Sequence, residues 1–190
     1  MARIAIPTLD IIYREVFVLQ PLYRATRHWL MENEFVDPKG DGSMESAMEV
    51  LYHYRKGTTI SPAEKELRIW WRTVKSSPVN LYVHHLDIDW NIIQMYDLEI
   101  MREGKKEKVQ KGEMRIGIRA YIDVPDLKSS PILKFFDNWY KTRLIKKNLE
   151  ESKKMLYQDA YRLQGMMKKY LDMKTFIPEE EKFHEKFEFI

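Results

Sequence analysis

The chain contains no cysteine among its 190 residues. This absence excludes disulfide bonds, thiolate metal sites and a cysteine nucleophile. No Asn-X-Ser/Thr acceptor for glycosylation occurs either. A chain without these features is typical of a reducing compartment, and we expect a cytoplasmic location.

Long apolar runs and glycine-rich loops are also absent. No stretch approaches the roughly 18 consecutive apolar residues that a membrane-spanning helix needs, so we expect no membrane span. The apolar start of the chain contains acidic residues, which a signal peptide lacks. The seven glycines form no phosphate-binding loop, and no nucleophile elbow or paired metal-binding histidine motif occurs. The sequence therefore indicates no enzyme class.

The chain is rich in apolar and charged residues. Hydrophobic residues make up 44% and aromatic residues 13%, enough for one substantial core. The net charge is only +3, but it is unevenly distributed. Residues 131–174 carry eleven Lys/Arg against five Asp/Glu, and residues 178–190 carry five Glu against two Lys. We therefore predict one α+β domain over residues 1–175 and an acidic, aromatic tail over residues 176–190.

The first part of the chain has helical spacing. Apolar residues from Leu9 to about Phe35 recur mostly at intervals of three and four, which predicts a helix. Pro21 lies inside this segment, and proline in a helix interior removes a hydrogen bond and clashes with the preceding turn. We therefore expect this N-terminal helix to be kinked or split.

The spacing then changes to strict alternation of apolar and polar residues. Four segments show it: residues 50–55, 67–73, 80–101 and 114–124. Alternation of this kind is typical of antiparallel strands with one buried and one solvated face. A Lys-rich turn joins the last two segments, and the sequence predicts a four-stranded antiparallel meander sheet.

The last element predicted is a long basic helix over residues 131–173, with proline at its first position. The fold class we predict is α+β: the four-stranded meander, the kinked N-terminal helix and this long helix. A curved antiparallel sheet holding a long C-terminal helix resembles helix-grip ligand-binding folds in architecture, although four strands are too few for the complete version. The resemblance implies a site between sheet and helix.

The sharpest candidate for chemistry is a polar stripe on the third predicted strand. His85, Asp87 and Asp89 alternate along it, so their side chains point the same way about 6.6 Å apart. A histidine with two carboxylates is a donor set for a divalent metal ion. The alternative is that the acids pair with Arg72, Arg115 or Arg119 on neighbouring strands, as solvated strand faces do. We favour the ion pairs and expect no cofactor, with a divalent metal as the alternative. The preceding His84 falls on the apolar face, where we expect a hydrogen-bonded core histidine.

A second candidate is the Arg-Ile-Trp-Trp-Arg segment. Trp70 and Trp71 must face opposite sides of a sheet. Trp70, flanked by Arg68 and Arg72, can stack a ligand ring or a base, or can anchor a protein contact. The alternative is that Trp70 packs beneath a helix or loop. The sequence leaves both open.

The long helix and the tail supply the remaining candidates. Lys146 and Lys147 belong to a row of lysines that can meet phosphates or an acidic protein surface. The tail presents Phe183, Phe187 and Phe189 among glutamates. Its acidic character matches the basic helix of another copy.

We therefore predict a non-catalytic interaction or assembly protein that self-associates through the long helix, the sheet face and the tail. Its partner is expected to be itself or another protein. A module that binds a hydrophobic ligand between sheet and helix is the alternative, and a cavity would distinguish it. Nucleic-acid binding comes third, and a metal-dependent enzyme using the His-Asp-Asp stripe comes last.

Overall fold

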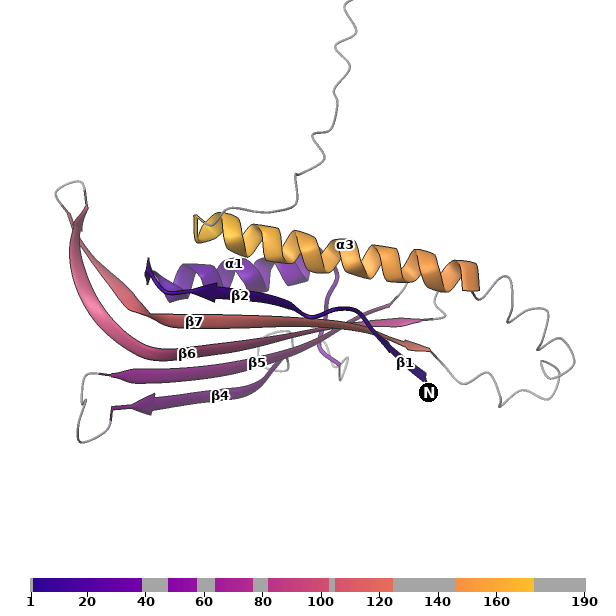
Figure 1. The fold of residues 1–190 in the computed structure, drawn as a ribbon, viewed down its shortest axis with the longest axis horizontal. Helices are drawn as coiled ribbons and strands as arrows, with labels where there is room; N and C mark the ends of the chain where they lie inside the picture. Colours follow the sequence, from indigo (N-terminus) through magenta and orange to yellow (C-terminus); the bar gives the residue numbers. More distant parts are fainter. Residues whose placement is uncertain are drawn as a thin grey trace, which may run out of the picture.

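The computed structural model describes residues 2–38, 48–57, 64–76, 82–102, 105–124 and 146–172. This part of the chain forms one antiparallel sheet of seven strands and two helices, with both helices over the same face of the sheet (Figure 1). The elements in chain order are β1 (Ala2–Ala5), β2 (Leu9–Tyr13), β3 (Val16–Phe17), α1 (Leu19–Glu32), β4 (Glu49–Lys56), β5 (Lys65–Ser76), β6 (Val83–Arg102), β7 (Lys105–Val124) and α3 (Lys146–Tyr170).

The predicted antiparallel sheet is confirmed, but the prediction of four strands is wrong. Strands β7, β6, β5 and β4 are neighbours in that order, and β1, β2 and β3 all pair with the other side of β7. The three extra strands occupy residues 2–17, where the sequence predicted part of a helix. The fold is therefore mostly sheet rather than a meander of four strands between two helices.

The N-terminal error has a physical reason. Leu9 and Ile11 alternate with exposed neighbours in β2 and pair in register with Ile118 and Ile116 of β7. A different set in the same segment, Leu9, Ile12 and Tyr13, fits a helical period, and long-range pairing decided between the two patterns. The helix begins only at Leu19, so Pro21 lies in its first turn, where a missing N–H costs little. The predicted kinked helix is thus a single helix with proline near its start.

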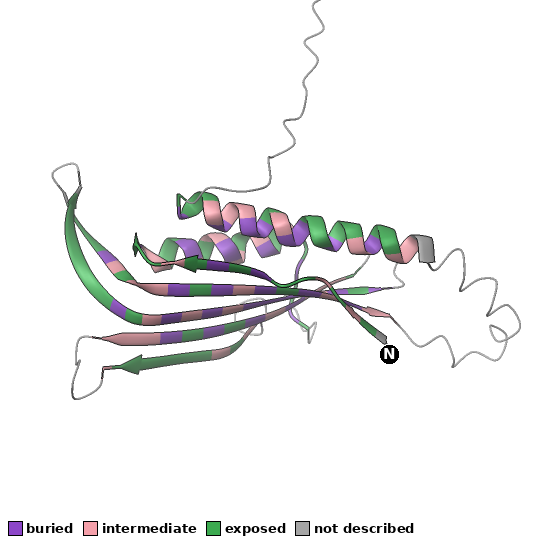
Figure 2. Cartoon of the chain, viewed as in Figure 1, coloured by how far each residue is buried: buried purple, intermediate pink, exposed green. Residues whose placement is uncertain are grey.

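The core lies between the sheet and the two helices, on what we call the inner face. Alternate residues of the long strands are buried there, as the banding in Figure 2 shows. The largest fully buried side chains on the sheet include Trp71 of β5 and Trp90 of β6. Helix α1 contributes Leu22 and Leu30, and α3 contributes a row at helical spacing: Leu156, Ala160, Leu163, Met167 and Leu171. The predicted long helix is described from Lys146 onward, and no helix in the described part of the chain is long and apolar enough to cross a membrane.

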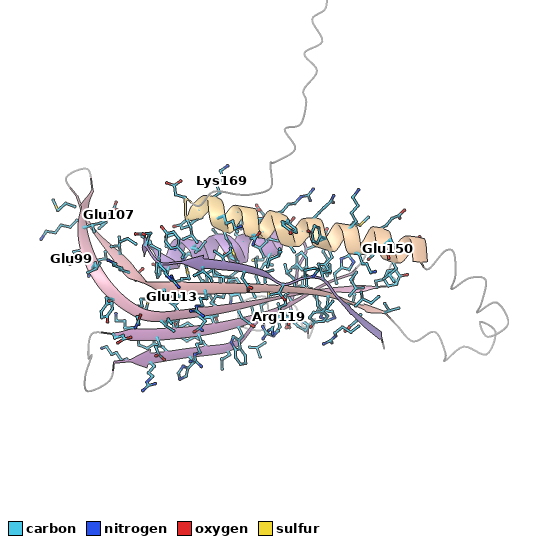
Figure 3. All side chains as sticks on the ribbon, viewed as in Figure 1. Glu99, Glu107, Glu113, Arg119, Glu150 and Lys169 are labelled. Carbon is cyan, nitrogen blue, oxygen red and sulfur yellow. The ribbon has the colours of Figure 1, made fainter. Side chains whose placement is uncertain are left out.

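The end of the β6–β7 hairpin at which β6 leads into β7 curls toward the face of the sheet that carries the helices (Figure 1). Glu99 and Glu107 lie on this curled end (Figure 3). Arg119 of β7 lies on what we call the outer face of the sheet, the face opposite the helices. A β-bulge between Ile93 and Tyr96 interrupts the register where the bend begins. Bulges increase local twist and bend a strand pair, so the bend has a local cause. It turns the end of the hairpin into a wall beside α1.

Candidate binding cleft

A cleft of about 530 Å³ lies between the start of α1 and the inner face of the sheet. Strands β4 and β5 form its floor and one side, and the curled part of the β6–β7 hairpin forms the other. Most of its lining is apolar or aromatic: Val18, Leu19, Tyr23, Tyr52, Tyr54, Leu67, Ile69 and Met95. The polar lining residues are Gln20, Glu49, Asp97, Lys108 and Gln110.

Gln110 fixes the start of α1 against the hairpin wall. Its side-chain oxygen accepts a hydrogen bond of 3.1 Å from the backbone N–H of Leu19. Val18 stands at the N-cap position of α1 and makes no side-chain cap. The first N–H groups of a helix have no partner within the helix, and a capping side chain next to the helix often accepts a hydrogen bond from one of them. Here the Gln110 side chain of β7 accepts that bond instead. The start of the helix and the hairpin are therefore joined by a hydrogen bond at one corner of the cleft.

An aromatic and acidic cluster forms part of the cleft wall, with Tyr23 and Glu49 in the lining and Trp71 behind them. The Tyr23 hydroxyl donates a hydrogen bond of 2.5 Å to Oε2 of Glu49, and the Trp71 indole N–H lies 3.4 Å from the same oxygen. The rings of Tyr23 and Trp71 meet edge to face with centroids 4.7 Å apart. Burial, and next the bond to Glu49, raise the pKa of the Tyr23 phenol well above its usual range. The phenol thus remains a hydrogen-bond donor to Glu49.

The rim of the cleft is aromatic on one side and charged on the other. Tyr52 and Tyr54 of β4 are 58% and 45% exposed, so their rings are available to a molecule entering the cleft. Across from them, Asp97 of β6 forms an ion pair with Lys65 of β5. Such a cleft can hold a molecule with an apolar or aromatic body and a polar group at one end.

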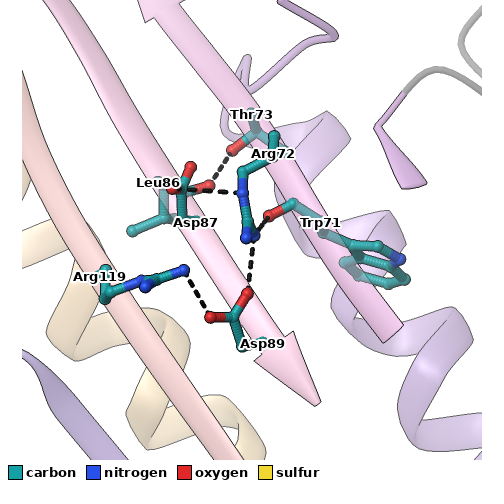
Figure 4. Close-up of polar contacts among 7 residues, drawn as sticks. All are labelled: Trp71, Arg72, Thr73, Leu86, Asp87, Asp89 and Arg119. Carbon is teal, nitrogen blue, oxygen red and sulfur yellow. Dashed lines mark hydrogen bonds and ion pairs between the residues drawn. The ribbon is translucent and has the colours of Figure 1, made fainter. Parts of the chain in front are cut away.

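The predicted stripe of His85, Asp87 and Asp89 lies elsewhere, on the outer face of the sheet. Arg72 lies between the two carboxylates: its Nε is 3.4 Å from Oδ2 of Asp87, and its Nη1 donates to Oδ1 of Asp89 at 2.7 Å (Figure 4). Arg119 donates to the other oxygen of Asp89 at 2.5 Å. The ion pairs expected from neighbouring strands are therefore present.

His85 has partners of its own. Its Nε2 lies 3.1 Å from Oδ2 of Asp123, and its ring stacks on Tyr121 with centroids 4.5 Å apart. Burial lowers the pKa of His85, and burial also raises the pKa of Asp87, against the effect of Arg72. No group of three or more metal-ligating side chains comes together in the described part of the chain. The metal site stays an untested prediction, and the geometry gives it no further support.

The other predicted site residues fall into two groups. Trp70 lies on the outer face and is exposed, with the Arg72 guanidinium 5.6 Å from its ring centroid. Arg68 is exposed on the same face, directly opposite Asn91 of β6. The side chains of Lys146 and Lys147, and the tail residues Phe183, Phe187 and Phe189, lie outside what the structure describes.

His84, by contrast, is a core residue, as expected from its place on the apolar face. It is 1% exposed, beneath α3, and its Nε2 lies 2.5 Å from the hydroxyl oxygen of Ser152. Burial lowers the pKa of His84, with Asp159 acting in the opposite direction. Lys75 lies 3.4 Å from Asp159 and completes this buried polar cluster.

The sequence suggested a site between sheet and helix as an alternative, but it did not identify the residues of the cleft, because they come from five different elements. One signal was available: alternation places Tyr52 and Tyr54 on the same face as their register partners Ile69 and Leu67. Both tyrosines would be core residues if a helix covered them, and α1 stops short of doing so.

We also compared the chain with known proteins. No family model matches it, and neither a curated protein nor a solved structure does. The geometry of the cleft and of the sheet is therefore what bears on function.

Proposed function

We propose that this protein binds a small molecule with an apolar or aromatic body in the cleft between α1 and the inner face of the sheet. The observation that carries the proposal is the cleft itself. Its volume of about 530 Å³ and its largely apolar lining with a few polar groups are typical of small-molecule sites. A cavity is also the feature that distinguishes the predicted ligand-binding module from a protein that only assembles with other chains.

The cleft also suggests which end of the molecule is polar. Oε2 of Glu49 accepts bonds from Tyr23 and Trp71, and this carboxylate is held in place by both. A carboxylate accepts hydrogen bonds and donates none when ionised. A ligand that carries a hydroxyl or amine N–H beside an aromatic body therefore suits the cleft, with its ring against Tyr52 and Tyr54.

The test is a fluorescence titration with N-phenyl-1-naphthylamine, a neutral aromatic probe with one N–H group that brightens in apolar sites. Val18→Trp places a large side chain in the cleft, while Val16→Trp makes the same change two residues earlier, at an exposed position of β3 outside the lining. We expect saturable binding by the wild type and by Val16→Trp, and affinity lowered roughly tenfold or more by Val18→Trp. Equal binding by all three proteins, or none by the wild type, would contradict the proposal.

Self-association and a cytoplasmic location remain predictions from the sequence. The exposed Trp70 suits a protein contact, because aromatic residues are enriched at interfaces. The basic helix face and the aromatic tail, which were to provide the rest of that contact, include side chains outside the described residues. Nucleic-acid binding rests on the same lysines and gains no specific observation.

A further inference from the structure

The two edges of the sheet are built differently. At one edge, β1, β2 and β3 are strands of four, five and two residues that follow one another along β7. Short, interrupted strands are one way in which proteins keep a sheet edge from pairing with another chain. At the other edge, β4 runs for eight residues, and within the described residues no strand pairs with its outer side (Figure 1).

The side chains of β4 are also unusual for a free edge. Val50 is 61% exposed, Tyr52 is almost as open to solvent, and Tyr54 is also exposed, although less so. On the outer face, the exposed Trp70 of β5 lies directly opposite Leu51. Proteins protect a free edge with proline, a central lysine or an inward-pointing charge. Residues 50–54 contain none of these. A β-bulge is a further form of protection, and the one register shift between β4 and β5 lies at the start of β4, between Glu49 and Leu51. The pairing of residues 51–56 with β5 is regular.

The charges of β4 are placed at its two ends. Glu49 begins the strand, and Arg55 and Lys56 end it. If two copies of this strand pair antiparallel, the acidic start of each lies beside the basic end of the other. Opposite charges across a strand pair stabilise it, and like charges destabilise it. The strand is therefore complementary to itself in the antiparallel direction and not in the parallel one.

We propose that the outer edge of β4 pairs antiparallel with β4 of a second copy of this chain, so that two sheets join across a two-fold axis. The pairing covers Val50 and the tyrosines of the edge strand. It also has a consequence for the cleft, because Tyr52 and Tyr54 belong both to the joined edge and to the cleft lining. The two clefts then lie on the same side of one continuous sheet, each bordered by the partner copy.

A cysteine-free chain allows a direct test, since any engineered cysteine is the only one present. Near a two-fold axis one residue of β4 lies opposite its own copy, with Cβ atoms about 4.5–5.5 Å apart, which a disulfide can bridge with small adjustment. Five single variants cover the strand: Leu51→Cys, Tyr52→Cys, His53→Cys, Tyr54→Cys and Arg55→Cys. Lys154→Cys on the exposed side of α3 is the control.

Under mild oxidation we expect at least one β4 variant to form a covalent dimer of twice the chain mass of 23.0 kDa, and the control to form little. The overturning result is cross-linking that is no greater in any β4 variant than in Lys154→Cys. Since the five substitutions are at separate positions, a folding failure in one of them does not remove the test.

Charge reversal gives a second measurement. Arg55→Glu with Lys56→Glu makes both ends of β4 acidic, while Lys154→Glu with Lys169→Glu makes the same charge change on α3, which packs on β7, β2 and α1. By light scattering over a range of concentrations, we expect the wild type and the α3 variant to dimerise. On dilution, the dimer of the β4 variant should dissociate at a concentration roughly tenfold or more above that at which the wild-type dimer dissociates. A wild type that has the mass of one chain at every concentration would overturn the proposal, as would a β4 variant that dimerises like the control.

Discussion

Gly112 of β7 lies against the backbone of Gln94 of β6, so closely that a Cβ on the glycine would stand 2.9 Å from the Gln94 carbonyl oxygen. The same Cβ would lie 2.9 Å from the Cα of Met95. Gln94 itself has a positive φ of 51°, which few residues other than glycine adopt. The close approach and the left-handed residue together form the bend that brings Met95 and Asp97 to the cleft.

Gly112→Ala is therefore expected to destabilise the protein and to distort the cleft. Overpacking against backbone atoms, which cannot rotate away, costs about 1–3 kcal/mol in the free energy of unfolding. Urea unfolding measures this cost, and the naphthylamine titration should show weaker binding because the hairpin wall moves. Gly117→Ala, five residues along the same strand, is the control: its Cβ would lie 3.4 Å from a side-chain oxygen of Asp10, an ordinary contact. Equal stability of the two variants would show that the bend does not depend on Gly112.

A second prediction concerns the hydrogen bond between Tyr23 and Glu49. Tyr23→Phe removes the hydroxyl and leaves the ring on Trp71, so the loss isolates one bond to a charged acceptor. Such bonds contribute about 1.5–3 kcal/mol, and we expect a loss near the lower end because Glu49 is only half-buried. Tyr52→Phe makes the same change on the exposed rim and should alter stability by less than about 0.5 kcal/mol. Denaturant unfolding of both variants checks the difference, and equal losses would contradict it.

A third prediction concerns the ion-pair network on the outer face. Arg72→Gln leaves Asp87, which is 8% exposed, without the cation at its side. Burial already raises the pKa of Asp87, and removal of Arg72 should raise it further. At neutral pH we expect a loss of roughly 1–3 kcal/mol in the free energy of unfolding, since a partly buried charge loses its partner.

The sign of the pH effect identifies the cause of that loss. A carboxyl with a higher pKa in the folded than in the unfolded chain regains stability as the pH falls through the folded pKa toward the unfolded value. The deficit of Arg72→Gln relative to the wild type should therefore shrink between pH 7 and the ordinary carboxyl pKa of 3.8. In the double variant Arg72→Gln, Asp87→Asn, the contribution of Asp87 to this change is absent. A deficit in Arg72→Gln that is constant with pH would show that the loss comes from packing instead.

The sequence predicted the strands whose pattern is local, and it failed where the structure depends on residues that are far apart in the chain. The four long strands were predictable because alternation continues over many residues, as in β7 from Met114 to Val124. The short strands were not, because Leu9, Ile12 and Tyr13 fit a helical period while Leu9, Ile11 and Tyr13 fit alternation. Pairing with β7 settles the choice, and it joins residues more than 100 positions apart in the chain.

The candidate site was less predictable for a related reason. The outer stripe of His85, Asp87 and Asp89 comes from one strand, so its common orientation could be predicted. The cleft instead depends on a bend at Gln94 and Gly112 and on where α1 begins. Glycine inside a strand is a known sign of a bulge or of close backbone approach, so Gly112 carried a signal. The direction of the bend, toward the helices, is set by packing and not by local sequence.

The fourth prediction concerns acid stability and the buried His84. Burial lowers the pKa of this histidine below the ordinary value of 6.5, so it is neutral in the folded protein and binds a proton more readily when the chain unfolds. Such a group contributes stability above pH 6.5 that is lost as the pH falls from 6.5 toward the folded pKa, by up to about 1.4 kcal/mol per pH unit. His84→Gln removes this contribution, so its free energy of unfolding should fall less steeply than that of the wild type between pH 7 and 5. His85, whose pKa burial also lowers, is present in both proteins and cancels in the comparison. His28→Gln, an exposed change on α1, is the control, and urea unfolding at several pH values is the measurement. If His84→Gln has the same acid slope as the wild type, the histidine under α3 does not control acid stability.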